Sequence, residues 1–193
     1  MNPTTDLQKQ LVNYIVQHSG HDRRRPYIGL SGIADCEAVI YDRYVHGTPA
    51  SIEEHMKTSI SYDLEHALVE KLRKLRLYKP SEEIILYDGL AQGHTDGRVG
   101  SDLLELKTIE REQWFPEHYL PVRIFYQVQA YLHYLSLPWA QVVYLARDTG
   151  AVRVYGIRRD EWKGEEIAQK LDRLVTAVTN MVRPECSCGR CKE

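Results

Sequence analysis

The stretch GHTDGRVGSDLLELKT, residues 93–108, mixes acids, glycines and leucines in an order that constrains the fold around it. Polar and apolar side chains alternate over 92–99 and again over 102–108, which predicts two β-strands. Gly100 and Ser101 fall between them and predict a tight turn. The stretch is therefore expected to form a hairpin of paired strands.

The alternation also predicts where the charged side chains point. Successive side chains of a strand lie on opposite faces, so Glu105 and Lys107 share one face, and Leu104 and Leu106 share the other. If the two strands pair, Asp96 converges on the face of Glu105. Two carboxylates in one patch can bind Mg²⁺ or Mn²⁺. A lysine beside them can stabilise a negatively charged oxygen next to the ion. The alternative is an ordinary solvent-facing hairpin with alternating charges.

Apolar residues at helical spacing, together with turn and breaker residues, predict the rest of the chain. Helices are predicted over 5–18, 31–44, 52–76, 122–135 and 160–182. Ser31 is the expected N-cap of the second helix. Three further strands are predicted over 82–88, 141–147 and 152–158.

The order of these elements is helices, a three-stranded meander, a helix, two strands and a closing helix. This order predicts the α/β class, with a mixed central β-sheet flanked by helices. One domain is expected over 1–193, with a helical part at 1–80, a sheet core at 81–160, and a helix with a cysteine tail at 161–193.

The composition is typical of a soluble globular protein: 43% of the 193 residues are hydrophobic, 27% are charged, and the net charge is −2. The N-terminus is polar and no apolar run approaches the roughly 20 residues of a membrane helix, so we expect a cytoplasmic protein with no membrane partner. A nearly neutral molecule attracts nucleic acid only through local basic patches. The candidates lie at 23–25 and 71–79, and solvated surface charge is the alternative for each.

The acids, the lysine and a later helix together carry a family resemblance. Asp96, Glu105 and Lys107 have the spacing D-x8-E-x-K, and the predicted helix that follows places Gln127 and Tyr131 four residues apart on one face. This order resembles the PD-(D/E)XK nuclease superfamily, and its RecB-like branch in particular. The resemblance implies a restriction-endonuclease-like core, with Tyr131 supporting the helix face.

The resemblance implies a metal-dependent deoxyribonuclease that hydrolyses phosphodiester bonds, expected to be a single-strand DNA exonuclease. By this resemblance, Mg²⁺ or Mn²⁺ would be bound by the carboxylates of Asp96 and Glu105 and by the carbonyl oxygen of Leu106. Lys107 would orient the attacking water, and Gln127 would steady the lysine or contact the phosphate backbone. DNA is the implied partner, with other proteins of recombination, repair, phage or CRISPR DNA processing as further candidates; oligomeric state is left open.

A further metal ligand is expected on the helix before the sheet, in SISYDLEHALVEKL, residues 59–72, where both Glu65 and His66 qualify. The buried face of this helix is predicted from a stripe formed by Ile60, Leu64, Leu68, Leu72 and Leu75. At about 100° per residue, Glu65 lies about 80° from the centre of the stripe, while His66 lies nearly opposite. The wheel favours Glu65, and His66 remains the alternative.

The four cysteines also follow a pattern of RecB-like nucleases, including those of CRISPR adaptation. One cysteine, Cys36, precedes the predicted core, and three, Cys186, Cys188 and Cys191, follow it. The resemblance implies a [4Fe-4S] cluster that joins the N- and C-terminal segments. Thiolates bind zinc equally well, so Zn²⁺ is the alternative.

Two other functions remain open at this point. The first is a non-catalytic nucleic-acid-binding module on a degenerate nuclease fold with a structural zinc site. The second is a partner subunit whose fold serves as an assembly surface. The intact set of Asp96, Glu105 and Lys107 argues against both.

Overall fold

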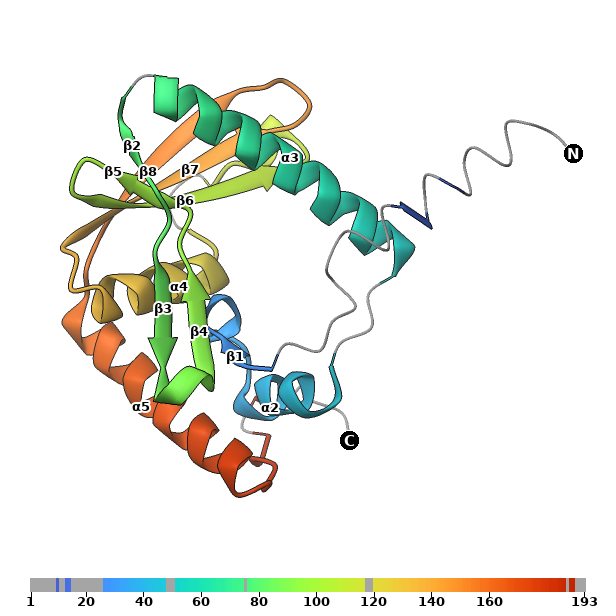
Figure 1. Cartoon of the computed structure of the whole chain (residues 1–193), viewed down its shortest axis with the longest axis vertical. Coiled ribbons are helices and arrows are strands. Elements are labelled where there is room, and N and C mark those ends of the chain that lie inside the picture. The colour runs from blue at the N-terminus through green and yellow to red at the C-terminus, as the bar shows by residue number, and fades with distance from the viewer. Residues whose placement is uncertain are drawn as a thin grey trace, which may run out of the picture.

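A computed structural model describes residues 10, 13–14, 26–47, 51–74, 76–116, 120–186 and 188–189. Two mixed β-sheets flanked by helices give the mixed α/β fold that the sequence predicted (Figure 1). The helices are α2 (Glu37–His46), α3 (Ile52–Lys74), α4 (Val122–Tyr134) and α5 (Glu161–Thr179). Short 3-10 turns are η1 (Leu30–Gly32), η2 (Tyr87–Gly89) and η3 (Glu112–Trp114). Within the described ranges, no helix has the length and apolar character needed to cross a lipid bilayer.

The larger sheet has the strand order β2-β5-β6-β7-β8. Its strands are β2 (Tyr78–Lys79), β5 (Gly97–Val99), β6 (Asp102–Ile109), β7 (Trp139–Ala146) and β8 (Val152–Arg158). Strands β6 and β7 are parallel, and the other neighbours are antiparallel. The smaller sheet has the order β1-β4-β3, with β1 (Ile28–Gly29) parallel to β4 (Ala91–His94) and β3 (Glu83–Leu86) antiparallel to it.

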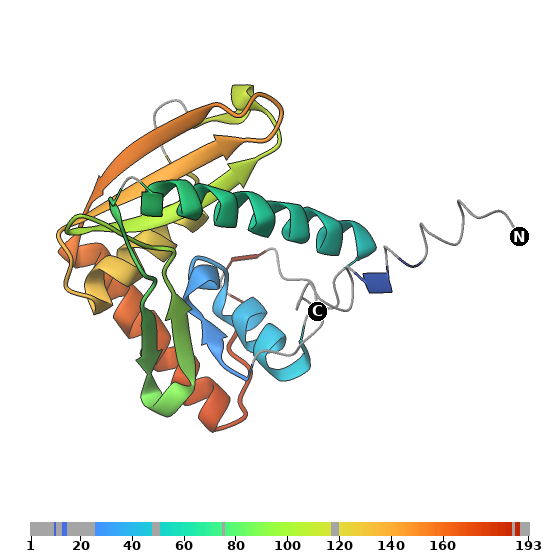
Figure 2. The ribbon, with the colours of Figure 1, turned by 45° about the horizontal axis from the view of Figure 1, so that its top comes forward.

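Helices cover both faces of the larger sheet, and the alternation of β6 decides which residues each helix meets (Figure 2). Leu104 and Leu106 belong to a small apolar cluster that also includes Leu68 and Leu72 of α3. Leu103, on the opposite face, belongs to the main core with residues of α4 and α5. The leucines therefore face α3, and the predicted separation of leucines from acids along this strand is confirmed.

The expected three-stranded meander is wrong, because residues 92–99 form two strands in different sheets. The chain leaves the smaller sheet after β4 and enters the larger one at β5. Thr95, between them, is buried; its hydroxyl accepts from the Glu82 N–H at 2.9 Å, and its own N–H donates to the Glu82 carbonyl at 3.1 Å. Gly97 follows at φ 130°, and a Cβ there would lie 2.5 Å from the Tyr78 ring. Only glycine fits this turn.

The predicted helix over 31–44 also needs correction. Helix α2 begins at Glu37 with Cys36 at its N-cap, and Ser31 lies in the 3-10 turn η1 instead of capping a helix. Leu30 and Ile33 are fully buried, and their burial holds this turn against the core. The helices predicted over 122–135 and 160–182 are confirmed with small shifts of their ends, and Asp160 caps α5.

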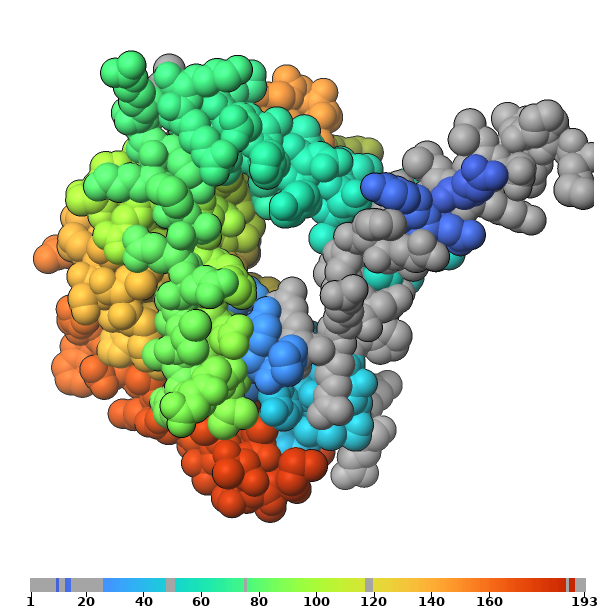
Figure 3. Space-filling view, viewed as in Figure 1, coloured from blue at the N-terminus to red at the C-terminus, as the bar shows by residue number. Residues whose placement is uncertain are grey.

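Most of the helix predicted over 5–18 and the basic run at 23–25 lie outside the described residues. Figure 3 shows a hollow on one face of the molecule, bordered by α3, the β3–β4 hairpin and the segment that contains η1 and α2.

Candidate active site

Asp96 lies where the chain passes from the smaller sheet to the larger one. Its Oδ2 accepts a hydrogen bond from the Leu106 N–H at 2.6 Å, and its carbonyl accepts one from the Tyr78 hydroxyl at 3.0 Å. Asp96 is thereby held against the edge of β6, directly before the start of β5. The N–H and C=O of a strand residue point to the same edge, so the Leu106 carbonyl is directed to the side of Asp96 as well.

Glu105 is a buried carboxylate at the centre of the larger sheet, with only 1% of its surface exposed. Its Oε1 accepts from Gln127 Nε2 at 2.6 Å and forms an ion pair with Lys107. Its Oε2 is buried and has no hydrogen-bond partner among the residues that the structure describes. An unpartnered buried carboxylate oxygen is costly and marks a place for a cation. A divalent metal ion therefore fits the donor set at Glu105.

The carboxylates of this cluster have raised pKa values. Burial raises the pKa of Glu105 to about 7, and the nearby Asp96 adds to this although Lys107 opposes it. Burial and the charge of Asp96 likewise raise the pKa of Glu65 to about 7. The pKa of Asp96 is also raised, mainly by burial. Perturbed carboxylates that converge in one place are typical of functional sites.

Lys107 is the positive charge of this cluster. Burial disfavours its charged form, but the carboxylates of Glu105, Asp96 and Glu65 outweigh that effect and raise the pKa of Lys107. The ammonium group is therefore held charged between the acids. A divalent ion among the same acids would compete with it for Glu105.

The carboxylates do not form a closed cage. Among the described residues, only the cysteine group gathers three metal-ligating atoms within 4.8 Å of one another. The oxygens of Glu65, Asp96 and Glu105 stand further apart, as mutually repelling acids do. Binding an ion would require these side chains to close around it.

Glu65, and not His66, faces the sheet. Ser61, one turn earlier on α3, shares a hydrogen bond of 2.8 Å with the Thr108 hydroxyl of β6, and Glu65 follows it on the same helix face. His66 is exposed. Ile60, which the sequence placed in the buried stripe, is 47% exposed. Leu64, Leu68 and Leu72 of the same stripe are half-buried as predicted, and Glu65 is half-buried next to them.

Gln127 and Tyr131 connect α4 to this cluster. Besides its bond to Glu105, Gln127 Nε2 lies 3.3 Å from the Tyr131 hydroxyl. Tyr131 is 1% exposed, and burial with the charge of Glu105 raises its pKa. A Cβ at Gly93 would lie 2.7 Å from Tyr131 Cε1, so only glycine lets β4 pack this close. Gln127 contacts the carboxylate directly, where the sequence predicted the lysine or a phosphate.

Two further residues that touch this region were not predicted from the sequence. Tyr78 of the short strand β2 holds the Asp96 backbone, and Thr95 fixes the sheet-to-sheet turn. Neither lies in a recognisable motif. Gly93 and Gly97 are the signal in the sequence, because a glycine within a strand commonly marks a place where another part of the chain approaches closely.

The cysteines from both ends of the described chain meet. Cys36 precedes α2, Cys186 and Cys188 follow α5, and their sulfur atoms lie within 4.8 Å of one another. The Sγ atoms of Cys186 and Cys188 are 3.5 Å apart. Tetrahedral zinc with bonds of about 2.3 Å spaces its sulfurs at about 3.8 Å, so the donor set fits a thiolate-bound metal. Cys191 lies outside the described residues.

Comparisons with known proteins support the fold. No family model and no curated protein matches the chain. The crystal structure of SSO0001 is 18% identical in sequence, with a TM-score of 0.61 over 96% of this chain and 93% of that one. LHK-Exo in complex with dAMP is 15% identical, with a TM-score of 0.58 over 83% of this chain and 92% of that one.

LHK-Exo is an alkaline exonuclease from Laribacter hongkongensis. A second structure of it gives a TM-score of 0.53 at 15% identity, over 82% of this chain and 90% of that one. At these identities the likeness establishes a shared fold. The chain therefore has a fold that an alkaline exonuclease also adopts.

Proposed function

We propose that the protein is a metal-dependent DNA nuclease of the PD-(D/E)XK type. The observation that carries the proposal is the unpartnered Oε2 of buried Glu105, beside Asp96 and Lys107. The exonuclease fold of the structural neighbours supports it, and one neighbour was crystallised with dAMP. The RecB-like order of the motifs points in the same direction.

The side chains divide the chemistry among them. The carboxylates of Asp96, Glu105 and Glu65, with the Leu106 carbonyl, would hold one or two Mg²⁺ or Mn²⁺ ions. Such an ion polarises a phosphoryl oxygen and lowers the pKa of a water that it binds. Lys107, which pairs with Glu105 in the absence of an ion, would hold the attacking water or a phosphate oxygen.

Gln127 has a positioning part in this proposal. Its amide occupies Oε1 of Glu105 at 2.6 Å, which leaves Oε2 for the metal. Hydrogen bonds to a ligand from outside the coordination sphere commonly fix its orientation. Tyr131 packs beside the same amide and supports it from α4.

Single-stranded DNA is the proposed substrate, with exonucleolytic cleavage. The hollow bordered by α3 and the β3–β4 hairpin gives a strand room to approach (Figure 3). Basic residues at the end of α3 are exposed and suited to phosphates; they are Lys71, Arg73 and Lys74. Binding should therefore weaken as salt concentration rises.

The cysteines are proposed to hold a thiolate-bound group that joins the chain ends. The family resemblance favours a [4Fe-4S] cluster, whereas the sulfur spacing of 3.5 Å between Cys186 and Cys188 favours a single zinc ion. Anaerobically purified protein decides between them. A brown solution absorbing near about 400 nm indicates the cluster, and a colourless protein with one zinc per chain indicates zinc.

The nuclease proposal is tested with end-labelled single-stranded DNA and Mn²⁺. Wild type is expected to shorten the DNA, Glu105→Ala and Lys107→Ala to lose at least about a hundredfold in rate, and the exposed Glu83→Ala to match wild type. Full activity in either site variant would overturn the assignment. DNA binding without shortening, under any divalent ion, would identify the non-catalytic binding module instead.

A further inference from the structure

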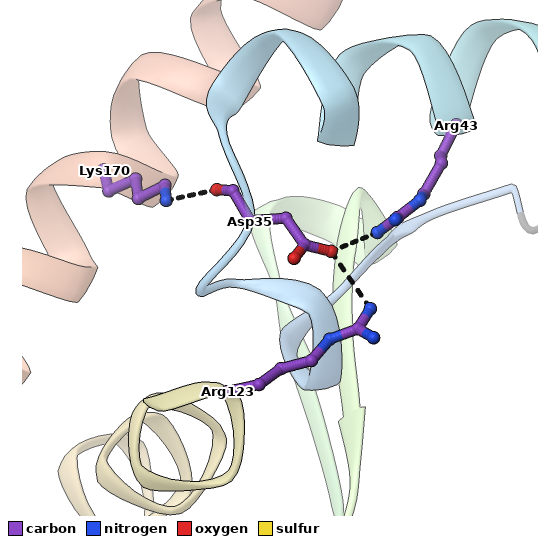
Figure 4. Close-up of polar contacts among 4 residues, drawn as sticks. All are labelled: Asp35, Arg43, Arg123 and Lys170. Carbon is purple, nitrogen blue, oxygen red and sulfur yellow. Dashed lines mark hydrogen bonds and ion pairs between the residues drawn. The ribbon is translucent and has the colours of Figure 1, made fainter. Parts of the chain in front are cut away.

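Three cationic side chains meet at Asp35, the residue before Cys36 (Figure 4). The Asp35 carboxylate accepts from Arg43 of α2 and from Arg123 of α4, the latter at 3.0 Å. Its backbone carbonyl accepts from Lys170 of α5 at 2.5 Å. Asp35 thus joins three helices directly beside a cysteine of the proposed metal-thiolate site.

Lys170 places a positive charge beside that site. Burial lowers the pKa of Lys170, while the neighbouring Glu37, Cys36 and Asp35 oppose the shift. The peptide that leads into Cys36 is therefore held by a partly buried cation. Lys170 and Asp35 are 135 positions apart in the sequence. The packing of α5 therefore brings Lys170 to Asp35.

Arg123 belongs to the same helix stripe as the active-site glutamine. Arg123, Gln127 and Tyr131 follow each other at intervals of four, so their side chains form one row along α4. Arg123 bonds to Asp35, and Gln127 bonds to Glu105. Tyr131 packs against β4. One row of side chains therefore contacts the region of the cysteine site, the metal site and the smaller sheet.

Core packing holds the middle and end of α4, and Arg123 adds a contact at its start. Pro121 occupies the N-cap and provides no side-chain hydrogen bond to the helix. Arg123 is 57% exposed, so its ion pair contributes little to global stability. Asp35 is only 25% exposed and is fixed by two other cations, so it offers Arg123 a rigid anchor. The contact is therefore suited to orienting the helix.

We propose that Arg123 is a positioning residue that aligns Gln127 with Glu105 and links the cysteine site to the metal site. The proposal rests on the proposed nuclease function. A group bound by the cysteines fixes Cys36 and the Asp35 peptide. Asp35 then holds Arg123, and α4 presents Gln127 to Oε1 of Glu105. Because α4 then holds Gln127 against Glu105, loading the cysteines should strengthen metal binding at Glu105, and by linkage a metal ion at Glu105 should strengthen binding at the cysteines by the same factor.

Mn²⁺ titration calorimetry tests the link. Each reduced protein is titrated in two states: with one equivalent of Zn²⁺ bound to its cysteines, and after a chelator has removed the zinc. The proteins are wild type, Arg123→Gln and Arg173→Gln. Arg173 pairs with Glu37 beside the same cysteine at 2.7 Å but lies outside the α4 stripe, so it is the matched control. Zinc loading should raise wild-type Mn²⁺ affinity by about fivefold or more.

The variants decide whether Arg123 carries that link. In Arg123→Gln the dependence on zinc should fall below about twofold, while Arg173→Gln should behave as wild type. The proposal is overturned if Arg123→Gln keeps the wild-type dependence, or if Arg173→Gln loses it equally.

A second measurement does not depend on metal binding. Gln129, on the same helix, also donates a side-chain hydrogen bond, to the Arg158 carbonyl at 2.8 Å. In Arg123→Gln, hydrogen exchange of the Gln127 side-chain amide should accelerate by about tenfold while that of Gln129 stays unchanged. Equal acceleration of both amides, or of neither, overturns the positioning role. If no form binds Mn²⁺, the nuclease proposal fails, and the exchange result still judges the placement of Gln127.

Discussion

Replacing Glu105 by glutamine should make the metal-free protein more stable while abolishing metal binding. Burial raises the pKa of Glu105 from 4.5 to about 7, so its ionised form is disfavoured in the folded state. A raised folded-state pKa contributes stability at low pH, and that contribution is lost as pH rises from about 4.5 through about 7. At about pH 8 the cost of the charge is about 3 kcal/mol.

Glutamine keeps the shape of Glu105 and removes this charge. Lys107 loses its ion-pair partner, and this loss reduces the expected gain in stability to about 2 kcal/mol. The reduction is small because the carboxylates of Asp96 and Glu65 still favour the charged form of Lys107. The assay is urea unfolding in a chelating buffer at about pH 8, compared with the exposed Glu83→Gln, which should change stability by less than about 0.5 kcal/mol.

Added Mn²⁺ should reverse the ranking of the two proteins. An ion present at about a hundred times its dissociation constant stabilises wild type by about 2.7 kcal/mol, and Glu105→Gln should gain almost none of this. Two results would refute the reasoning: a variant less stable than wild type in chelator, or equal stabilisation of both proteins by Mn²⁺.

Three further predictions follow from the same geometry. Glu65→Ala should weaken Mn²⁺ binding by at least about tenfold and His66→Ala by less than about twofold, measured by calorimetry; the reverse order would make the histidine the ligand. Because the pKa values of Glu65 and Glu105 are raised to about 7, protons should compete with the metal, and Mn²⁺ affinity should fall by up to about a hundredfold for each pH unit below that value; a flat profile would contradict this. Gly93→Ala should lower the free energy of unfolding by about 1–3 kcal/mol, because its Cβ would lie 2.7 Å from a ring carbon, whereas Gly156→Ala meets open space and should be nearly neutral in urea unfolding.

The faces of β6 could be predicted from the sequence because strand alternation is a local property. Leu104 and Leu106 face α3 while Glu105 lies on the opposite, buried side. The break at Thr95 could not be predicted in the same way. It depends on hydrogen bonds to Glu82, thirteen positions earlier, and on which sheet each half of the segment joins.

The candidate metal ligand on α3 shows the limits of a helical wheel. The wheel correctly turned Glu65 toward the sheet, but it included Ile60 in the buried face, and Ile60 is 47% exposed. The apolar pattern alone gives no information about how far a helix extends beyond the sheet it covers. The contacts of Asp35 with Arg123 and Lys170 join residues 88 and 135 positions apart, and no local pattern predicts them.

The most direct test of the proposed metal centre is anomalous diffraction from a crystal soaked in Mn²⁺. An anomalous peak is expected among the carboxylates of Asp96, Glu105 and Glu65 and the Leu106 carbonyl, at about 2.0–2.3 Å from the ligand oxygens. The Nζ of Lys107 should then have left Glu105. A Mn²⁺ peak at the cysteines or at His66, with no density beside Glu105, would contradict the account.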